Sequence, residues 1–200
     1  MDNANLLTAV SAIFNALILL FMLRVWMQGC NVYIGPKYAR FVINCTKHAV
    51  QFLGNKVTRG GLNLSAIAAI AILLVAKYSV EYGIFFDLPL EELTSHAAYI
   101  AKPFLLCLKL GGALFLVIIF LSAILSWFSR GSELSQLCDQ MLGPIYGELR
   151  RFIPPFGAID ITPLILIIAI QVADWLIAEM LAKIYSDAPG IVYFLWISFL

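Results

Sequence analysis

The sequence predicts an all-helical, polytopic membrane protein with four transmembrane helices, and two observations support this fold class. First, 62% of its 200 residues are hydrophobic and its mean hydropathy is +0.93, whereas soluble domains contain about 45–50% apolar residues. Second, four apolar segments are long enough to cross a hydrocarbon core of about 30 Å at 1.5 Å per helical residue. They lie at about residues 5–27, 64–86, 104–128 and 162–184. The first lacks the basic start and cleavage site of a secretory signal, so we expect it to be retained.

The distribution of basic residues predicts the orientation. Residues 29–62 carry five basic residues and no acidic residue, whereas the link between the second and third spans carries three acids and one lysine. The five basic residues are Lys37, Arg40, Lys47, Lys56 and Arg59. Because basic loops stay in the cytoplasm, we expect residues 29–62 and 129–161 there and both termini outside.

Each of these two loops is predicted to contain an amphipathic helix. In residues 38–52 the apolar face consists of Tyr38, Phe41, Val42, Cys45, Ala49 and Phe52. In residues 134–145 it consists of Leu134, Leu137, Cys138, Met141, Leu142 and Ile145. Such helices would lie in the membrane plane, and the basic one would favour anionic lipid headgroups. The alternative is that each helix packs over its own bundle, and the sequence leaves both open.

The segment "ELRRFIPPFGAIDITPLI" at residues 148–165 is expected to turn the second in-plane helix into the last span. Pro154 and Pro155 deny the helix backbone donors, and Gly157 permits the turn. Thr162 and Pro163 suit the N-cap and the first helical position. Asp160 adds negative charge near the positive end of the helix dipole.

The chain is predicted to contain two parallel repeats. A weaker copy of the same segment, "GGLNLSAI", occurs at residues 60–67, and Trp26 and Trp127 end the first and third spans. Each repeat would contain a span, an amphipathic helix and a span, at residues 1–90 and 91–200. A short apolar segment at the C-terminus is expected at the membrane interface.

These motifs resemble the YggT family of bacterial membrane proteins, which has YlmG-type relatives in plastids. The residues that carry the resemblance are Arg24, Trp26, Trp127, Pro144, Arg150, Arg151, Pro154, Gly157, Asp160 and Pro163. The first repeat departs from the pattern, because Gly54-Asn55 stand where paired arginines are expected. The resemblance implies a bacterial inner-membrane protein with a role in osmotic or salt stress, and in such a membrane the termini that we expect outside would be periplasmic. It also implies a link to potassium uptake, and it supplies no catalytic residues.

Ionisable residues within the spans are candidates for a functional site, because charges at bilayer depth are costly. They are Lys77, Glu81, Lys109, Asp174, Glu179 and Lys183. Lys77 and Asp174 lie at similar depths, so they would meet if their helices were neighbours. We expect either a polar pathway for an ion or a neutralised buried pair that fixes how the repeats dock.

Two functions are compatible with the sequence. No catalytic motif, cofactor motif or zinc pattern occurs, and a net charge of +1 argues against nucleic acid as a direct partner. The first is a non-enzymatic scaffold or assembly factor for osmotic and envelope stress resistance. It would bind headgroups or other membrane proteins through the basic residues of residues 29–62 and through Arg150 and Arg151. The alternative is a potassium transporter or channel, which would require a homo-oligomer.

Overall fold

The computed structural model confirms that the chain is all-helical. It describes residues 3–33, 35, 37–54, 56–57, 62–85, 97–128, 131–152 and 162–185. The helices are α1 (Asn3–Gly29), α2 (Lys37–Phe52), α3 (Leu64–Phe85), α5 (Ala97–Phe128), α6 (Glu133–Phe152) and α7 (Thr162–Tyr185). Within these ranges the two amphipathic segments form α2 and α6, as predicted, and α6 continues through Pro144 to Phe152.

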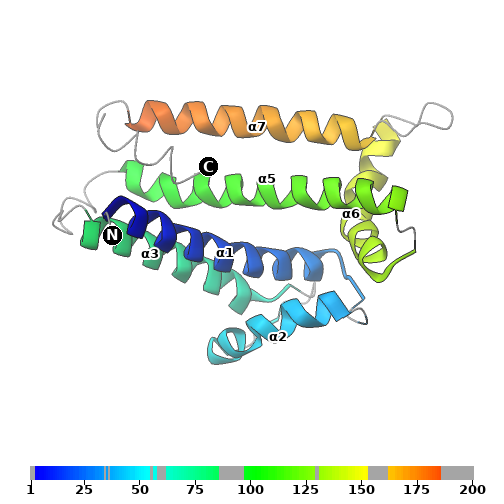
Figure 1. Ribbon diagram of the computed structural model, residues 1–200, viewed down its shortest axis with the longest axis horizontal. Coiled ribbons are helices and arrows are strands. Elements are labelled where there is room, and N and C mark those ends of the chain that lie inside the picture. Colours follow the sequence, from blue (N-terminus) through cyan, green and yellow to red (C-terminus); the bar gives the residue numbers. More distant parts are fainter. Residues whose placement is uncertain are drawn as a thin grey trace.

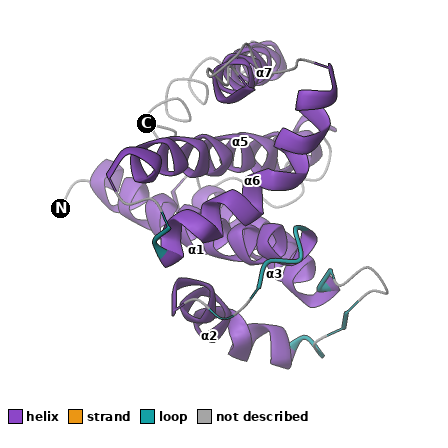
Figure 2. Cartoon of the chain, turned by 90° about the vertical axis from the view of Figure 1, so that its right-hand side faces the viewer, coloured by secondary structure: helices purple, strands orange, loops and turns teal. Residues whose placement is uncertain are grey.

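The four long helices lie alongside one another, with α2 and α6 near one end (Figure 1). α1 and α5 run toward that end, and α3 and α7 run back from it. α1 packs on α3, and α5 packs on α7, while α1 also touches α5. Figure 2 shows α5 between α7 and the α1–α3 pair. α2 touches α1, α3 and α6, whereas α6 touches α5, α7 and α2.

Three described helical segments are long and apolar enough to cross a membrane. They are Asn5–Gly29, Pro103–Leu125 and Thr162–Met180, with mean hydropathies of 2.4, 2.7 and 1.8. The apolar part of α3, Leu64–Val80, is shorter than a full span by the same measure. A fourth crossing therefore stays a prediction, although α3 as a whole has 22 residues.

Two apolar clusters hold the described helices together. One contains Ile18 and Phe21 of α1, Leu74 of α3 and Leu106 of α5. The other lies where α2 and α6 meet the long helices, and contains Met27, Val42, Ile119, Met141 and Leu142. Because α1 contributes to both clusters, it connects the packing of the long helices to that of α2 and α6.

The helix ends explain how the chain turns at this end of the bundle. After α1, Asn31 adopts a left-handed φ of 51°, and Val32 N donates to Met27 O at 3.0 Å, which is the Schellman pattern. At the start of α3, Ala66 N donates to Asn63 Oδ1 at 3.1 Å. Asn63 therefore has the capping role that the sequence predicts for Thr162, where α7 begins. Pro154, Gly157 and Asp160 lie outside the described residues.

Candidate functional site

α2 presents three different faces, each about a third of a helical turn from the next. Ala39, Val42, Thr46 and Val50 are buried against the bundle. A second face is apolar and exposed, and we call it the apolar stripe: Tyr38, Phe41, Cys45, Ala49 and Phe52. The third is the polar face, which carries the exposed residues Lys37, Arg40, Asn44, Lys47, His48 and Gln51.

The predicted apolar face of α2 is therefore divided. Of its members only Val42 is buried, whereas Phe41 is 65% exposed and Phe52 is 90% exposed. The residues that reach the bundle include Ala39 and Thr46, which a pattern based on large apolar residues does not select. One face of α2 thus packs on the bundle, as the alternative interpretation expects, and another apolar face is left uncovered. Whether the uncovered face lies on a membrane stays a prediction.

A buried arginine fixes the rotation of α2 against α1. The Arg24 side chain is only 6% exposed. Its Nη1 donates to Thr46 Oγ1 at 2.6 Å and to Ile43 O at 3.3 Å, and Thr46 Oγ1 donates to Val42 O at 2.8 Å. No acidic residue occurs between residues 3 and 80, so this segment offers no carboxylate to the guanidinium. Its hydrogen bonds go instead to the Thr46 hydroxyl and to a main-chain carbonyl, both on α2.

Trp26 couples α1 to α6, through a carbonyl near a proline. Its Nε1 donates to Met141 O at 3.2 Å, and Cys30 Sγ lies 3.3 Å from the same oxygen. Pro144 lies inside α6, where its missing N–H leaves the carbonyl of Gln140 without its helical donor. Trp26 of α1 and Cys30, directly after α1, reach the next carbonyl along, that of Met141. The contact joins Trp26 to a carbonyl three residues before Pro144, and Trp26 and Pro144 both carry the family resemblance.

Two further hydrogen bonds join the start of α2 to α6. Tyr33 N donates to Gln140 Oε1 at 2.9 Å, and Lys37 N donates to Glu133 Oε2 at 3.3 Å. The Glu133 carboxylate thus lies at the N-terminus of α2, where the positive end of the helix dipole favours an anion. α2 and α6 are therefore linked by polar contacts as well as by packing, and they form a shared platform.

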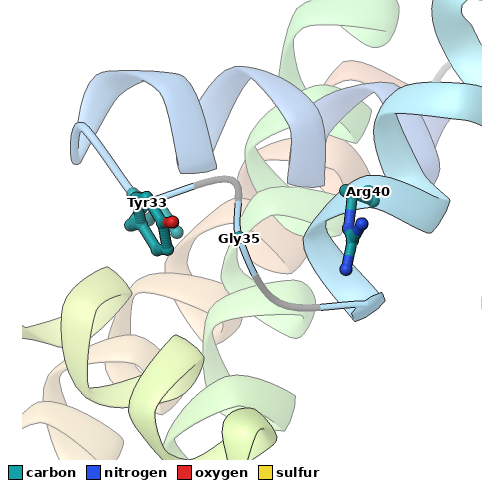
Figure 3. A pocket seen from close by; sticks show the side chains of 4 residues that line it. Tyr33, Gly35 and Arg40 are labelled. Carbon is teal, nitrogen blue, oxygen red and sulfur yellow. The ribbon is translucent and has the colours of Figure 1, made fainter.

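An open pocket of about 760 Å³ lies beside the loop between α1 and α2. Its described lining residues are Val32, Tyr33, Gly35 and Arg40. Figure 3 shows Tyr33 and Arg40 on opposite sides of the loop, with Gly35 between them. A Cβ added at Gly35 would overlap the Tyr33 ring, so a glycine is needed for this ring position. The pocket combines a guanidinium with an aromatic ring.

The predicted intramembrane charges occupy two separate places. Lys77 is 2% exposed, and its Nζ donates to Asn15 Oδ1 at 2.7 Å, between α3 and α1. Asp174 lines a cavity of about 220 Å³ between α7 and α5, together with Gln171 and Lys109. α5 lies between α7 and the α1–α3 pair. The condition for Lys77 to meet Asp174 is therefore not fulfilled.

The remaining predicted site residues are dispersed. Lys56, Arg150 and Arg151 are exposed, and Glu179 is exposed on α7. Arg151 Nη1 pairs with Glu148 Oε1 at 2.9 Å, and the Arg150 guanidinium lies 5.5 Å from the centre of the Tyr146 ring. Arg59 and the side chains of Glu81, Trp127 and Lys183 lie outside the described part of the structure.

The described side chains do not form a metal site, since no group of three His, Cys, Asp or Glu residues lies close enough to hold an ion. The buried thiol in α6 is also chemically unsuited to be a nucleophile. Burial, followed by the charge of Asp139, raises the pKa of Cys138 to about 11, so its reactive thiolate is scarce at neutral pH. Burial also raises the pKa of Cys30.

Comparison with known proteins identifies the family. A protein-family model described as CCB3/YggT matches residues 102–181. An Escherichia coli K12 protein named "Uncharacterized protein YggT" is 27% identical over 174 residues, which cover 86% of this chain and 88% of that protein. Residues 102–181 therefore belong to the YggT family, and relatives of that family match most of the chain. An uncharacterized Vibrio alginolyticus protein is 25% identical over 178 residues, covering 88% of this chain and 95% of that protein. No solved structure matches the chain significantly.

The family model covers residues 102–181. Arg24, which carries the family resemblance, and its hydrogen-bond partner Thr46 both lie outside this range. Thr46 and Gln140 were not selected by sequence reasoning, and Met141 was selected only for the apolar face of its helix. These three residues receive the hydrogen bonds from Arg24, Tyr33 and Trp26, respectively. A threonine within a face otherwise made of Ala39, Val42 and Val50 is the signal that could have indicated the first of these. A main-chain acceptor such as Met141 O leaves no signal in its own side chain.

Proposed function

We propose that the chain is a non-enzymatic integral-membrane scaffold, whose docking surface is the polar face of α2 together with the adjoining pocket. The observation that carries this proposal is that α2 is rigidly attached to α1 and α6 while its basic residues stay exposed. A binding surface on a rigid element avoids part of the ordering cost of association. We place this end of the bundle in the cytoplasm, as the basic loop favours.

The chemistry of the docking surface favours an acidic partner. Arg40 and Lys47 are exposed on the polar face, and α2 contains no acidic residue. The guanidinium of Arg40, which lines the open pocket, suits a bidentate contact with a carboxylate or a phosphate. In this proposal the scaffold recruits another membrane protein through an acidic segment, and the osmotic and envelope stress role depends on that recruitment.

Photocrosslinking in native membranes tests the scaffold. A photoreactive residue at Lys47 is expected to give discrete protein adducts, whereas one at Ile13, which is 62% exposed on α1, serves as the control and should give none. Arg40→Glu should reduce the adducts at position 47, because it reverses the charge of the pocket, while Arg151→Glu on α6 should leave them unchanged. The absence of any reproducible adduct at position 47 would remove the proposal.

Cation transport is the second candidate, and the cavity between α5 and α7 is the observation that favours it. Asp174 has no hydrogen-bond or ion-pair partner among the described residues, and it lines a cavity large enough for several water molecules. Potassium flux into liposomes should then be abolished by Asp174→Asn. Glu179→Gln, which changes an exposed acid of the same helix outside the cavity lining, should leave it intact. Equal flux in wild type and Asp174→Asn would exclude this route.

A further inference from the structure

We propose that the apolar stripe of α2 inserts among the acyl chains of a leaflet that contains anionic phospholipids. The inference rests on the proposed function, since it names the lipid partner of the same docking end. The apolar stripe and the polar face would then have different occupants: lipid for Tyr38, Phe41, Cys45, Ala49 and Phe52, and the recruited protein for Arg40 and Lys47.

The first argument is that the bundle leaves the apolar stripe uncovered. Phe41 and Phe52 are 65% and 90% exposed, and Tyr38 is 41% exposed. The face that packs on the bundle lies about a third of a turn away, and Arg24 holds it there through Thr46. α2 therefore cannot roll to bury its aromatic side chains without breaking a buried, charged hydrogen bond.

The second argument is the position of α2. It lies beside the end of α1 and the beginning of α3, at the bundle end toward which α1 and α5 run (Figure 1). α1 contains a segment long and apolar enough to span, so the end of that segment is where the lipid interface is expected. An apolar helix face with aromatic residues is stable at this boundary, where the acyl chains begin.

The third argument is the charge of α2, which indicates the lipid composition that the helix prefers. Lys37 lies at the boundary between the polar face and the apolar stripe, where an ammonium group reaches the phosphate level, and its Nζ is 5.1 Å from the centre of the Tyr38 ring. Arg40 and Lys47 add positive charge on the same helix, which contains no acid, and the Glu133 carboxylate of α6 offsets part of this charge only at the N-terminus of α2. A basic helix of this kind is attracted to anionic headgroups over about a Debye length.

The native thiol of Cys45 provides the test, because it is exposed in the middle of the apolar stripe. Cys30, Cys107 and Cys138 are replaced, Cys45 is labelled with an environment-sensitive dye, and the full chain is reconstituted in liposomes with brominated lipids as quenchers. The matched control carries the dye at Asn44→Cys with Cys45→Ala, one residue away on the polar face. We expect most of the fluorescence at position 45 to be quenched and little at position 44.

Lipid composition and salt complete the experiment. Quenching at position 45 should be stronger with phosphatidylglycerol than with phosphatidylcholine alone, and 1 M NaCl should remove the difference. Equal quenching at positions 44 and 45 would overturn the insertion, and equal quenching in both lipids would overturn the anionic preference. Adducts at Lys47 report on the scaffold independently, so retained adducts without quenching would remove this inference alone. Retained quenching without adducts would remove the proposed function alone.

Discussion

α2 and α6 look alike in sequence, yet the structure uses their apolar residues differently. In α6 the predicted apolar face is covered: Leu137, Cys138, Met141 and Leu142 are buried, and Leu134 and Ile145 are half-buried. In α2 five of the six predicted apolar residues are exposed. The comparison teaches that amphipathicity shows that a helix has an apolar face but does not show what covers it.

The difference follows from the neighbours of each helix. The face of α6 lies in a cluster that also contains residues of α1, α5 and α7, including Met27, Ile119 and Ile170. α2 contacts the bundle through a narrow face of small and medium side chains, Ala39, Val42, Thr46 and Val50. Small side chains allow close approach over a narrow contact, so the larger aromatic residues of α2 remain outside it.

The largest expected difference between α6 and α2 is the loss of stability when an apolar side chain is shortened. Leu142 of α6 is fully buried, so Leu142→Ala should destabilise the protein by about 2–5 kcal/mol through lost contacts and a cavity. Phe41→Ala on α2 should change stability by less than about 0.5 kcal/mol in detergent, because Phe41 is exposed. Thermal unfolding of the purified variants measures both. Equal losses would mean that the Phe41 side chain is covered in the folded protein.

The attachment of α2 can be broken at one hydrogen bond. Thr46→Val keeps the shape of the side chain but removes the closer of the two acceptors of Arg24 Nη1, and only Ile43 O at 3.3 Å remains. The loss of a hydrogen bond from a buried charged donor should cost about 1–3 kcal/mol. Adding Arg24→Met should recover part of this loss, because no charge then remains buried. A double-mutant cycle of unfolding temperatures measures the coupling, and additive effects would show that the two side chains do not interact.

The link from α1 to α6 can be tested at Trp26. Trp26→Phe removes the donor to Met141 O and should cost about 0.5–1.5 kcal/mol. In a Pro144→Ala background the same substitution should cost about as much, since the N–H regained at residue 144 bonds to the carbonyl of Gln140, four residues earlier, and leaves Met141 O unchanged. A clearly smaller loss in that background, measured by thermal unfolding, would mean that the proline makes the Met141 carbonyl available.

The smallest expected effect compares two thiols, Cys45 in α2 and Cys138 in α6. In detergent, a membrane-permeant maleimide at pH 7.5 should label Cys45, which the protein leaves exposed, and leave the buried Cys138 unmodified until the protein unfolds. The raised pKa of Cys138 also predicts how the stability of the folded protein changes with pH. Stability from this group is complete below pH 9.0, the ordinary value, and declines as the pH rises toward about 11, because only the unfolded thiol then loses its proton. Rapid labelling of Cys138 in the folded protein would contradict its burial.

The sequence by itself determined the helical class, the long apolar segments and the place of the amphipathic helices. These features depend on local properties. Apolar length predicts four spans, three of which the structure confirms as helices long enough to span. A period of 3.6 residues predicts α2 and α6. The Thr162-Pro163 pair also predicted the start of α7 to within one residue, because start signals of a helix involve adjacent residues. The family resemblance was equally local, since its motif lies mainly within residues 144–163, inside the part of the chain that the family model matches.

Only the tertiary structure decided which face of α2 is buried, which carbonyl receives Trp26 and where the intramembrane charges lie. Lys77 contacts Asn15 of α1 while Asp174 faces a cavity beside α5, because the order of helices in the bundle places α5 between them. Each of these contacts joins residues far apart in the chain, and the Trp26 indole acts on a main-chain oxygen 115 residues away. Periodicity reports the faces of one helix, whereas the choice of neighbour depends on how all the helices pack together.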